Sequence, residues 1–307
     1  MILGLGCAQL GNLYEERTDD EAAAIVDAAW NAGIRFYDTA PHYGLGLSER
    51  RLGRALRGRP RAQYRISTKV GRLLEPVDGD GGDDLADGFA VPRTHRRVWD
   101  FTRDGVLRSI EESLTRLGLD RIDLALLHDP EHHPEAALRS GFPALAELRA
   151  QGVVGAIGAG SKDPAVLHRI VTECTPDAVL VAGRYTLLEQ PAAPLLADCA
   201  SAGVAVLAAG VFNSGLLASP VPGPSLPYEY GEAPAPVVAR ARSLASACAE
   251  FGTTLPAAAI AFPTRHPAVS GLVVGADSAD QVRRNASWFA DPPADALWAF
   301  LEGRGLL

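Results

Sequence analysis

Lysine is nearly absent from this chain of 307 residues. Arginine accounts for 27 of the 29 basic residues, and the two lysines are Lys69 and Lys162. A guanidinium is planar and permanently charged, whereas an ammonium is a compact charge whose pKa responds to its surroundings. A lysine retained in so arginine-rich a chain is therefore a candidate for a role that arginine cannot fill.

Cysteine is also scarce. The four cysteines lie far apart in the sequence, and no CxxC spacing occurs. This excludes the usual zinc and dithiol motifs and predicts reduced thiols in a cytoplasmic protein. The first residues, MILGLGCAQLG, are apolar but follow no basic segment, so they predict a first β-strand and not a signal peptide.

The chain has neither a basic tract nor a long hydrophobic run. A net charge of −8 without a basic tract argues against nucleic acid as a partner. The apolar run at 203–212 is far shorter than the ~20 residues that a membrane-spanning helix needs. The sequence thus predicts a protein that binds a small-molecule substrate and neither nucleic acid nor membrane. It leaves the oligomeric state open.

Short apolar segments alternate with amphipathic ones along the chain. The apolar segments predict strands at 2–6, 34–37, 65–68, 122–127, 153–157, 178–181, 204–208 and 269–274. The amphipathic segments predict helices at 19–32, 47–57, 104–117, 135–150, 163–173, 190–201, 236–251 with 255–264, 278–289 and 293–303. Eight strands with crossover helices predict an α/β fold, a (β/α)8 TIM barrel in which residues 1–307 form a single domain. A doubly wound sheet is the alternative with the same element order.

Two connections are much longer than the few residues usual between a strand and a helix. They follow the third and seventh predicted strands and span 71–103 and 209–235. In a barrel such loops lie at the carboxyl ends of the strands, where active sites form. Side chains from these loops and from the loop after the second strand are candidate substrate contacts: His42, Trp99, Phe212 and Asn213.

Titratable side chains end three consecutive predicted strands. Asp38 follows the second strand, Lys69 the third and His128 the fourth, and Tyr43 lies in the loop after Asp38. Taken singly, each has an ordinary structural explanation, such as a turn cap or a packed loop aromatic. The predicted barrel, however, brings all four to one small region at the carboxyl ends of the strands.

Together these four groups form a coherent acid/base site. A phenol has a pKa of about 10, and a nearby ammonium is expected to lower it by favouring the phenolate. Asp38 would hold Lys69 charged and oriented, while His128 could donate a hydrogen bond to a substrate oxygen. Tyr43 is therefore the candidate proton donor and acceptor for a carbonyl or alcohol.

The segment FYDTAPHYGLGLSERRLGRAL resembles the signature of the aldo-keto reductases, whose catalytic tetrad is Asp, Tyr, Lys and His. In this sequence the tetrad falls on Asp38, Tyr43, Lys69 in ISTKVGR and His128 in LLHDP. The resemblance covers essentially the whole chain. Within the family, THRRVWDF and AGRYTLLEQ are most similar to the branch of L-fucose and D-threo-aldose 1-dehydrogenases, with a pyridoxal 4-dehydrogenase nearby.

The resemblance implies a nicotinamide dinucleotide bound without a Rossmann domain. The segment GAIGAG at 155–160 has its glycines in the wrong order for a dinucleotide fingerprint, and we interpret it as a strand end that needs close backbone approach. Ser278 is expected to cap a helix whose N-terminus suits a phosphate. By resemblance, the cofactor contacts fall on Ser161, Lys162, Gly275, Ala276, Asp277, Ser278, Gln281 and Asn285.

Three positions depart from the family pattern around the nicotinamide. Lys162 stands where an asparagine is common, Ala182 where a glutamine is usual, and Ala209 where an aromatic residue is expected, with Phe212 three residues later. Asp277 stands where relatives often carry a basic residue, and its carboxylate would repel a 2′-phosphate. NAD is therefore the predicted cofactor, with NADP as the alternative.

A run of possible metal ligands follows His128, namely Asp129, Glu131, His132 and His133. Adjacent side chains on one loop rarely converge on one ion without partners elsewhere in the fold. We therefore predict no metal site.

The resemblance implies an NAD(P)-dependent oxidoreductase that oxidises an aldose such as L-fucose at C1 to its lactone. The long loops carry the mixture of polar and aromatic groups that a sugar needs. One loop supplies His95, Arg96, Arg97 and Trp99, and the other supplies Asn213, Tyr228 and Tyr230. Two alternatives remain among enzymes, a pyridoxal 4-dehydrogenase and a general NADPH-dependent aldehyde reductase. A non-catalytic nucleotide-binding regulatory subunit is a remote alternative, which the intact tetrad disfavours.

Overall fold

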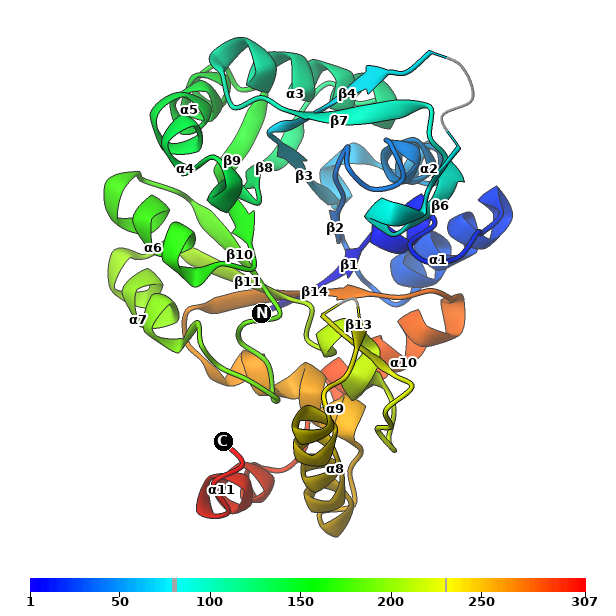
Figure 1. The fold of residues 1–307 in the computed structure, drawn as a ribbon, viewed down its shortest axis with the longest axis vertical. Coiled ribbons are helices and arrows are strands. Elements are labelled where there is room, and N and C mark those ends of the chain that lie inside the picture. The colour runs from blue at the N-terminus through cyan, green and yellow to red at the C-terminus, as the bar shows by residue number, and fades with distance from the viewer. Residues whose placement is uncertain (79–81, 230) are drawn as a thin grey trace.

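The computed structural model describes residues 1–78, 82–229 and 231–307. Eight parallel strands close into a barrel in which neighbours in the chain are neighbours in space (Figure 1). The (β/α)8 prediction is confirmed, and the doubly wound alternative is wrong because the sheet has no open edges. The barrel strands are β1 (Ile2–Gly6), β2 (Phe36–Asp38), β3 (Arg65–Val70), β8 (Ile122–His128), β9 (Val154–Ser161), β10 (Ala178–Ala182), β11 (Ala205–Ala209) and β14 (Val269–Gly275).

Helices surround the barrel and connect its strands (Figure 1). Those that follow successive strands are α1 (Asp19–Asn31), α2 (Leu47–Leu56), α3 (Arg103–Leu117), α5 (Phe142–Ala150), α6 (Pro164–Glu173), α7 (Ala193–Ala202), α8 (Ala235–Glu250) with α9 (Leu255–Ala261), and α10 (Ala279–Ala290). The last helix, α11 (Asp295–Gly303), packs with α8 and α9 around Leu244, Leu255 and Trp298.

The predicted helix at 135–150 is interrupted. It begins as α4 (Pro134–Ala136), continues through a π-helical segment at Ala137–Gly141 and becomes α5 at Phe142. Proline near the start of α5 removes a backbone donor, which favours the irregular hydrogen bonding before it. Short 3-10 turns complete the chain: η1 (Ala8–Gly11), η2 (Arg61–Gln63), η3 (Leu85–Asp87), η4 (Pro130–His132), η6 (Asn213–Ala218) and η7 (Phe262–Arg265).

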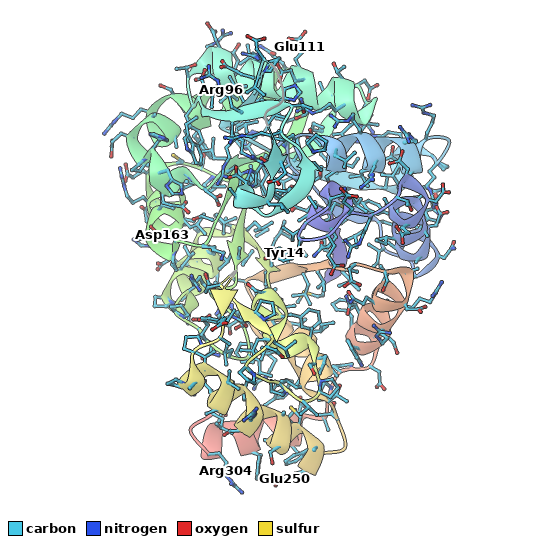
Figure 2. The ribbon with its side chains drawn as sticks, turned by 45° about the vertical axis from the view of Figure 1, so that its right-hand side comes forward. Tyr14, Arg96, Glu111, Asp163, Glu250 and Arg304 are labelled. Carbon is cyan, nitrogen blue, oxygen red and sulfur yellow. The ribbon has the colours of Figure 1, made fainter. Side chains whose placement is uncertain are left out.

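The two long connections contain regular structure that the sequence prediction missed. After β3, β4 (Arg72–Pro76) pairs antiparallel with β7 (His95–Trp99), and β5 (Asp83–Asp84) pairs with β6 (Phe89–Pro92). After β11, β12 (Pro227–Tyr228) pairs with β13 (Gly231–Glu232). The two extensions lie on opposite sides of the barrel (Figure 1), and Arg96 of β7 lies at the outer edge of the molecule (Figure 2). Tyr230 lies outside the described residues.

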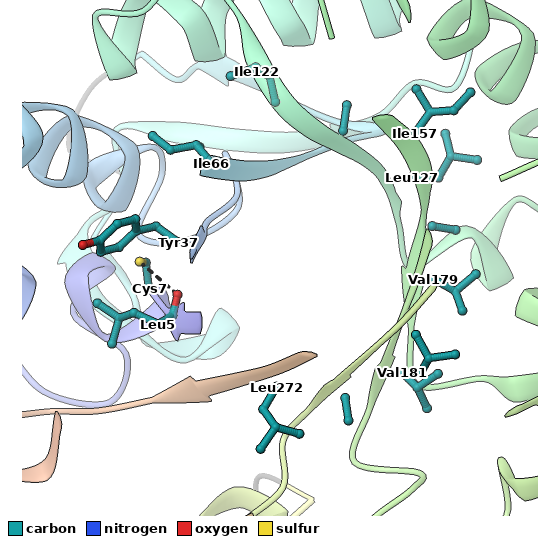
Figure 3. Packing of buried hydrophobic residues seen from close by; sticks show 14 of the residues in the cluster. Leu5, Cys7, Tyr37, Ile66, Ile122, Leu127, Ile157, Val179, Val181 and Leu272 are labelled. Atoms are coloured by element: carbon teal, nitrogen blue, oxygen red, sulfur yellow. Dashed lines mark hydrogen bonds between the residues drawn. The ribbon is translucent and has the colours of Figure 1, made fainter. Parts of the chain in front are cut away.

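Alternation along each strand separates two apolar layers. Leu5, Tyr37, Ile66, Leu127 and Leu272 point away from the barrel centre toward the helices (Figure 3). The residues that face the barrel interior form a smaller cluster: Phe36, Leu124, Leu126, Ala178, Leu180, Leu207 and Val273. This interior layer fills the barrel below the carboxyl ends of its strands. It supports the inward-facing side chains that come next along the same strands.

No single helix in the described ranges is long and apolar enough to cross a membrane. The pair formed by Ala235–Glu250 and Leu255–Arg265 reaches the required length and composition only if both are counted together, and it is bent by 95°. All seven residues of α9 are buried in the protein.

Strand β9 continues to Ser161, four residues beyond its predicted end, and the glycines of GAIGAG lie inside it. A Cβ at Gly158 would lie 1.7 Å from the carbonyl oxygen of Ala178 on β10. The expected close backbone approach is confirmed, but it occurs in the strand and not at its end. Absent side chains let the neighbouring strands stay paired here.

We expect Gly158→Ala to lower the free energy of unfolding by at least about 2 kcal/mol, because the new methyl group would push β9 and β10 apart. Gly160→Ala is the matched control, since its Cβ would meet Leu180 at an ordinary 3.5 Å. Urea unfolding of the two variants measures the difference. Equal stability of both variants would contradict this account of β9.

Candidate active site

The inward rows of three neighbouring strands end in charged or titratable groups. Asp38 follows Phe36 in the inward row of β2, Lys69 lies on β3 opposite Leu126, and His128 ends the inward row of β8. The alternation that places leucines in the barrel interior therefore also turns these three side chains inward, one layer above. All three are at least 93% buried.

Lys69 is the centre of the constellation. Its Nζ donates to Asp38 Oδ2 at 2.7 Å, to the Thr39 carbonyl oxygen at 3.0 Å and to the Tyr43 hydroxyl at 3.1 Å. An ammonium has three N–H donors, and each has one acceptor here. All three acceptors lie within 3.1 Å of a single nitrogen, which suits the compact ammonium of a lysine and not a planar guanidinium.

The ammonium and the phenol are both protonated at neutral pH. Burial lowers the pKa of Lys69, but the charges of Asp38 and Tyr43 outweigh it, so the net shift is upward. Burial raises the pKa of Tyr43 to about 12, despite the opposing effect of Lys69. Lys69 acts on this pKa in the expected direction, but the net shift is upward in the free protein, because loss of water around the phenol has the larger effect.

His128 completes the group as a neutral imidazole. Its ring lies 6.0 Å from that of Tyr43, centroid to centroid, and nearly perpendicular to it. Burial, and then the positive charges of Arg72 and Lys69, hold the pKa of His128 well below its usual range. A neutral imidazole carries one N–H donor and can hydrogen-bond a substrate oxygen without adding a charge to the site.

A second buried carboxylate, Glu49, supports the site from behind. Its Oε1 accepts from the Thr68 hydroxyl at 2.7 Å, and its Oε2 accepts from Arg116 Nε at 2.6 Å, with the side chain fully buried. Thr68 immediately precedes Lys69, so Glu49 ties α2 and α3 to the strand that carries the lysine. Glu49 is the acid in LSERR, within the segment that resembles the family signature, and that resemblance gave it no role of its own.

Two arginines from the extension after β3 also reach the site. Arg97 was expected only as a polar group for a sugar, and Arg72 was assigned no role. Arg72 pairs with Asp129 and lies over the Trp99 ring at 4.4 Å. Arg97 donates to His42. A pattern that could have found them is the alternation of β4 and β7, which turns Arg72, Arg97 and Trp99 to one side.

A cavity of about 440 Å³ begins at Tyr43 and Asp38 and runs to the loop before α10. Its walls come from the loops after β1, β9, β10, β11 and β14. Among the predicted site residues, those that line it are Asp38, Tyr43, Lys162, Phe212, Asn213, Gly275, Asp277 and Gln281. Gln9 and Arg17, which the sequence analysis did not single out, line it as well.

Other predicted contacts lie behind this surface. Ser161 is buried and its hydroxyl donates to Glu131 at 2.7 Å. Asn285 donates to the Gly275 carbonyl oxygen at 3.4 Å, and Ser278 caps α10 by accepting from the Gln281 amide, as predicted. Trp99 packs against Phe101 and the rings of the loop after β8, with centroids 5.1 to 5.9 Å apart.

Charged side chains close one side of the cavity. Glu229 accepts from Lys162 at 2.9 Å and from both terminal nitrogens of Arg184 at 3.0 and 3.1 Å. Glu189 accepts from Asn213 and from the Tyr228 hydroxyl, each at 2.9 Å. These bonds hold the extension after β11 against the loops after β9 and β10. Lys162, placed by resemblance at the nicotinamide, is thus part of an ion cluster in the free protein.

The cavity suits a long polar ligand such as a nicotinamide dinucleotide. Gln9 Oε1, Asp38 Oδ1 and Asn213 Oδ1 are buried atoms of lining residues that have no hydrogen-bond partner in the described part of the chain. Unpartnered buried acceptors are costly unless a ligand or water satisfies them. The far end lies at the N-terminus of α10, where backbone N–H groups favour an anion. The residues present therefore fit the group that the resemblance implies.

We expect Lys69→Met to lower the free energy of unfolding by about 3–5 kcal/mol, because Asp38 would stay buried without its counter-ion. Lys162→Met, which removes the other lysine, is the matched control. Its pair with Glu229 is about 30% exposed, and such pairs contribute about 0–1 kcal/mol. Chemical denaturation compares the two. A loss at Lys69 no larger than at Lys162 would show that Asp38 does not depend on Lys69.

Comparison with known proteins shows the family to which this chain belongs. The Aldo/keto reductase family model matches residues 2–296. A D-threo-aldose 1-dehydrogenase of Pseudomonas sp is 51% identical over 97% of this chain and 92% of that protein. A pyridoxal 4-dehydrogenase of Microbacterium luteolum is 39% identical, with 99% and 94% covered. The solved structure of the aldo-keto reductase AKR11C1 from Bacillus halodurans has a TM-score of 0.76 at 26% identity, covering 96% of this chain and 88% of that one. This chain belongs to the aldo/keto reductase family of oxidoreductases, which use nicotinamide cofactors.

Proposed function

We propose that this enzyme oxidises an aldose, such as L-fucose, at C1 to its lactone. The observation that carries the proposal is the buried Lys69 ammonium bonded at once to Asp38 and to the Tyr43 hydroxyl, at the inner end of a long polar cavity. The similarity to a D-threo-aldose 1-dehydrogenase over nearly the full length of both chains supports an aldose as the substrate.

In this proposal each member of the tetrad has one role. The hydroxyl proton on C1 passes to the Tyr43 oxygen as the C1 hydrogen leaves as hydride, and a lactone carbonyl results. Lys69 stabilises the phenolate that accepts the proton, Asp38 keeps Lys69 charged, and His128 donates a hydrogen bond to the C1 oxygen. When bound, the nicotinamide dinucleotide supplies the hydride acceptor.

We place that cofactor along the cavity, with the nicotinamide beside Tyr43 and the phosphates toward α10. The residues proposed to hold it are Ser161, Lys162, Gly275, Ala276, Asp277, Ser278, Gln281 and Asn285. Ser161, Ala276 and Asn285 would act by shaping the backbone, since their side chains face the protein.

The sugar would lie where the two extensions approach the tetrad. On one side Asn213 provides a hydrogen-bonding group and Phe212 an apolar face, and Asn213 is held by Glu189, which also accepts from Tyr228. His42 lies on the other side, next to Tyr43. This mixture suits the hydroxyls and the C–H faces of a sugar ring better than it suits a simple aliphatic aldehyde.

A series of kcat/KM values over L-fucose, D-arabinose, L-galactose, pyridoxal and benzaldehyde, with NAD and NADP, tests the substrate assignment. We expect the aldoses to exceed benzaldehyde by at least about tenfold, because a site with buried hydrogen-bonding groups disfavours ligands that leave them unpaired. Activity confined to pyridoxal would instead favour the function named for the 39% identical relative. Activity confined to benzaldehyde would indicate a general aldehyde reductase.

The raised pKa of Tyr43, about 12, predicts a pH dependence with a definite sign. Oxidation needs the phenolate, whose fraction rises with pH below that pKa, so kcat/KM for oxidation should climb from about pH 7 to 10. Reduction uses the protonated phenol and should change little over that range. Tyr43→Phe should abolish the pH-dependent activity, with a loss of at least ~100-fold in kcat. An oxidation rate that is flat or falls with pH would contradict Tyr43 as the base.

We also propose that NAD is preferred over NADP. Asp277 lines the far end of the cavity, and its carboxylate would repel a 2′-phosphate at a cost of about 1–2 kcal/mol, roughly five- to thirtyfold. Nearby Arg17 donates to the Asp277 carbonyl oxygen at 3.0 Å and lies 3.9 Å from Glu15. The ratio of kcat/KM for the two cofactors measures the preference, and Asp277→Arg should move it toward NADP. A wild-type preference for NADP that Arg17→Met removes would assign the phosphate to Arg17 and overturn the proposal.

A further inference from the structure

Arg97 is a buried cation fixed by carboxylates of its own extension. Its terminal nitrogens donate to Asp84 at 2.8 and 2.6 Å and to Asp87 at 3.0 Å. The Arg97 side chain is 11% exposed, and that of Asp84 is fully buried. A guanidinium held by two carboxylates has little freedom to turn, so its remaining donors have a fixed direction.

Those remaining donors meet His42. Arg97 Nε donates to His42 Nδ1, and Arg97 Nη2 donates to the His42 carbonyl oxygen at 3.0 Å. Arg72 Nη1 lies 3.5 Å from the same Nδ1. Because arginine has only donors, Nδ1 must present a lone pair to them. The single proton of a neutral His42 therefore resides on Nε2.

His42 is neutral for the same electrostatic reasons as His128. Burial, with the positive charges of Arg72, Arg97 and Lys69 next in importance, lowers the pKa of His42 to about 2. Protonation of Nδ1 would also place a second donor against Arg97. The tautomer with the proton on Nε2 is thus the one compatible with its surroundings.

This imidazole lies beside the reacting groups. Its ring centroid is 5.6 Å from that of His128 and 6.0 Å from that of Tyr43, and Phe89 packs edge-on against it at 5.2 Å. No residue in the ranges 1–78, 82–229 and 231–307 forms a hydrogen bond with its Nε2. The site therefore has two neutral imidazoles side by side, one of which has a proton locked on the nitrogen that no described residue binds.

We infer that His42, held by Arg97, is the subsite for a hydroxyl on the carbon next to the reacting carbon. This inference rests on the proposed function, in which His128 donates a hydrogen bond to the oxygen on C1. His42 would donate a hydrogen bond to the neighbouring oxygen on C2. The oxygens on two adjacent carbons match the N–H donors of the two adjacent rings, His128 and His42. A substrate with only a carbonyl oxygen would leave one of these donors unpaired. In this arrangement Arg97 is a positioning residue, and the enzyme selects 2-hydroxy carbonyl compounds and their cyclic hemiacetals.

D-Arabinose and 2-deoxy-D-ribose test this subsite, because they differ only in the 2-hydroxyl. We expect kcat/KM of the wild-type enzyme with NAD to be at least about tenfold higher for D-arabinose, since the deoxy sugar leaves the His42 donor unpaired. His42→Phe keeps a ring but removes the donor, and it should bring the ratio of the two sugars to near one. His42→Gln, which retains an N–H donor, should restore part of the ratio.

Replacing Arg97 alone would leave the Asp84 carboxylate buried without its counter-ion and would destabilise the protein. The double variant Asp84→Asn with Arg97→Met removes both charges, and we expect it to lower the sugar ratio severalfold. Arg96→Met is the matched control: Arg96 is 63% exposed, pairs with Glu75 and turns away from the site, so the ratio should stay at the wild-type value. A double variant with an unchanged ratio would overturn the positioning role of Arg97.

The tautomer of His42 can also be measured directly, without turnover of a substrate. Nitrogen-15 NMR of labelled histidines, with His42 assigned by comparison with His42→Phe, should show an unprotonated Nδ1 and a protonated Nε2 in the wild type. The double variant should show a mixture of tautomers. A proton on Nδ1 in the wild type would overturn the proposal directly.

The sugar pair also separates this inference from the proposed function. If neither sugar is oxidised with NAD or NADP, the aldose assignment fails, and reduction of glycolaldehyde against acetaldehyde applies the same comparison of a 2-hydroxyl with its absence. Equal kcat/KM for the two members of whichever pair is turned over refutes the subsite while leaving the oxidoreductase intact. A ratio that falls in His42→Phe supports it.

Discussion

The buried ion pair between Lys69 and Asp38 is the interaction on which the site depends. Removing two charges from water is costly, and the cost is offset only when geometry is good and every donor has an acceptor. The barrel supplies that geometry, since adjacent parallel strands bring Asp38 and Lys69 to 2.7 Å at the level above the inner apolar layer. The third N–H group of the ammonium then donates to the Tyr43 hydroxyl.

The same burial decides the protonation states around the pair. Phenol and imidazole both lose water in this region, so Tyr43 keeps its proton and His128 and His42 stay neutral. Three cations surround these groups without charging the rings. Two are arginines, which contribute fixed and directional donors, and the third is a lysine, which contributes a compact charge beside the Tyr43 hydroxyl. Because the chain has only one other lysine, Lys162, this difference between lysine and arginine is already indicated by the sequence.

The two extensions of the barrel are fastened to different parts of the site. The β4–β7 extension carries Arg72 and Arg97 to the rings beside the tetrad. The extension after β11 is fastened by Glu229 and Glu189 to the loops around the long cavity. The two extensions are therefore held by separate ion clusters, so a change in the contacts of one leaves those of the other in place.

The sequence by itself determined the barrel and the tetrad, because each depends on local patterns. Alternating apolar strands and amphipathic helices define the order of elements, and Asp38, Lys69 and His128 each lie at or next to the end of a strand that the sequence pattern predicts. Tertiary structure alone decided the rest. The paired strands β4 and β7 are distant in the chain, so only the folded structure shows that Arg72 and Arg97 converge on His42. The pKa of Tyr43 moved opposite to expectation because burial, a property of the whole fold, exceeded the effect of one neighbouring charge.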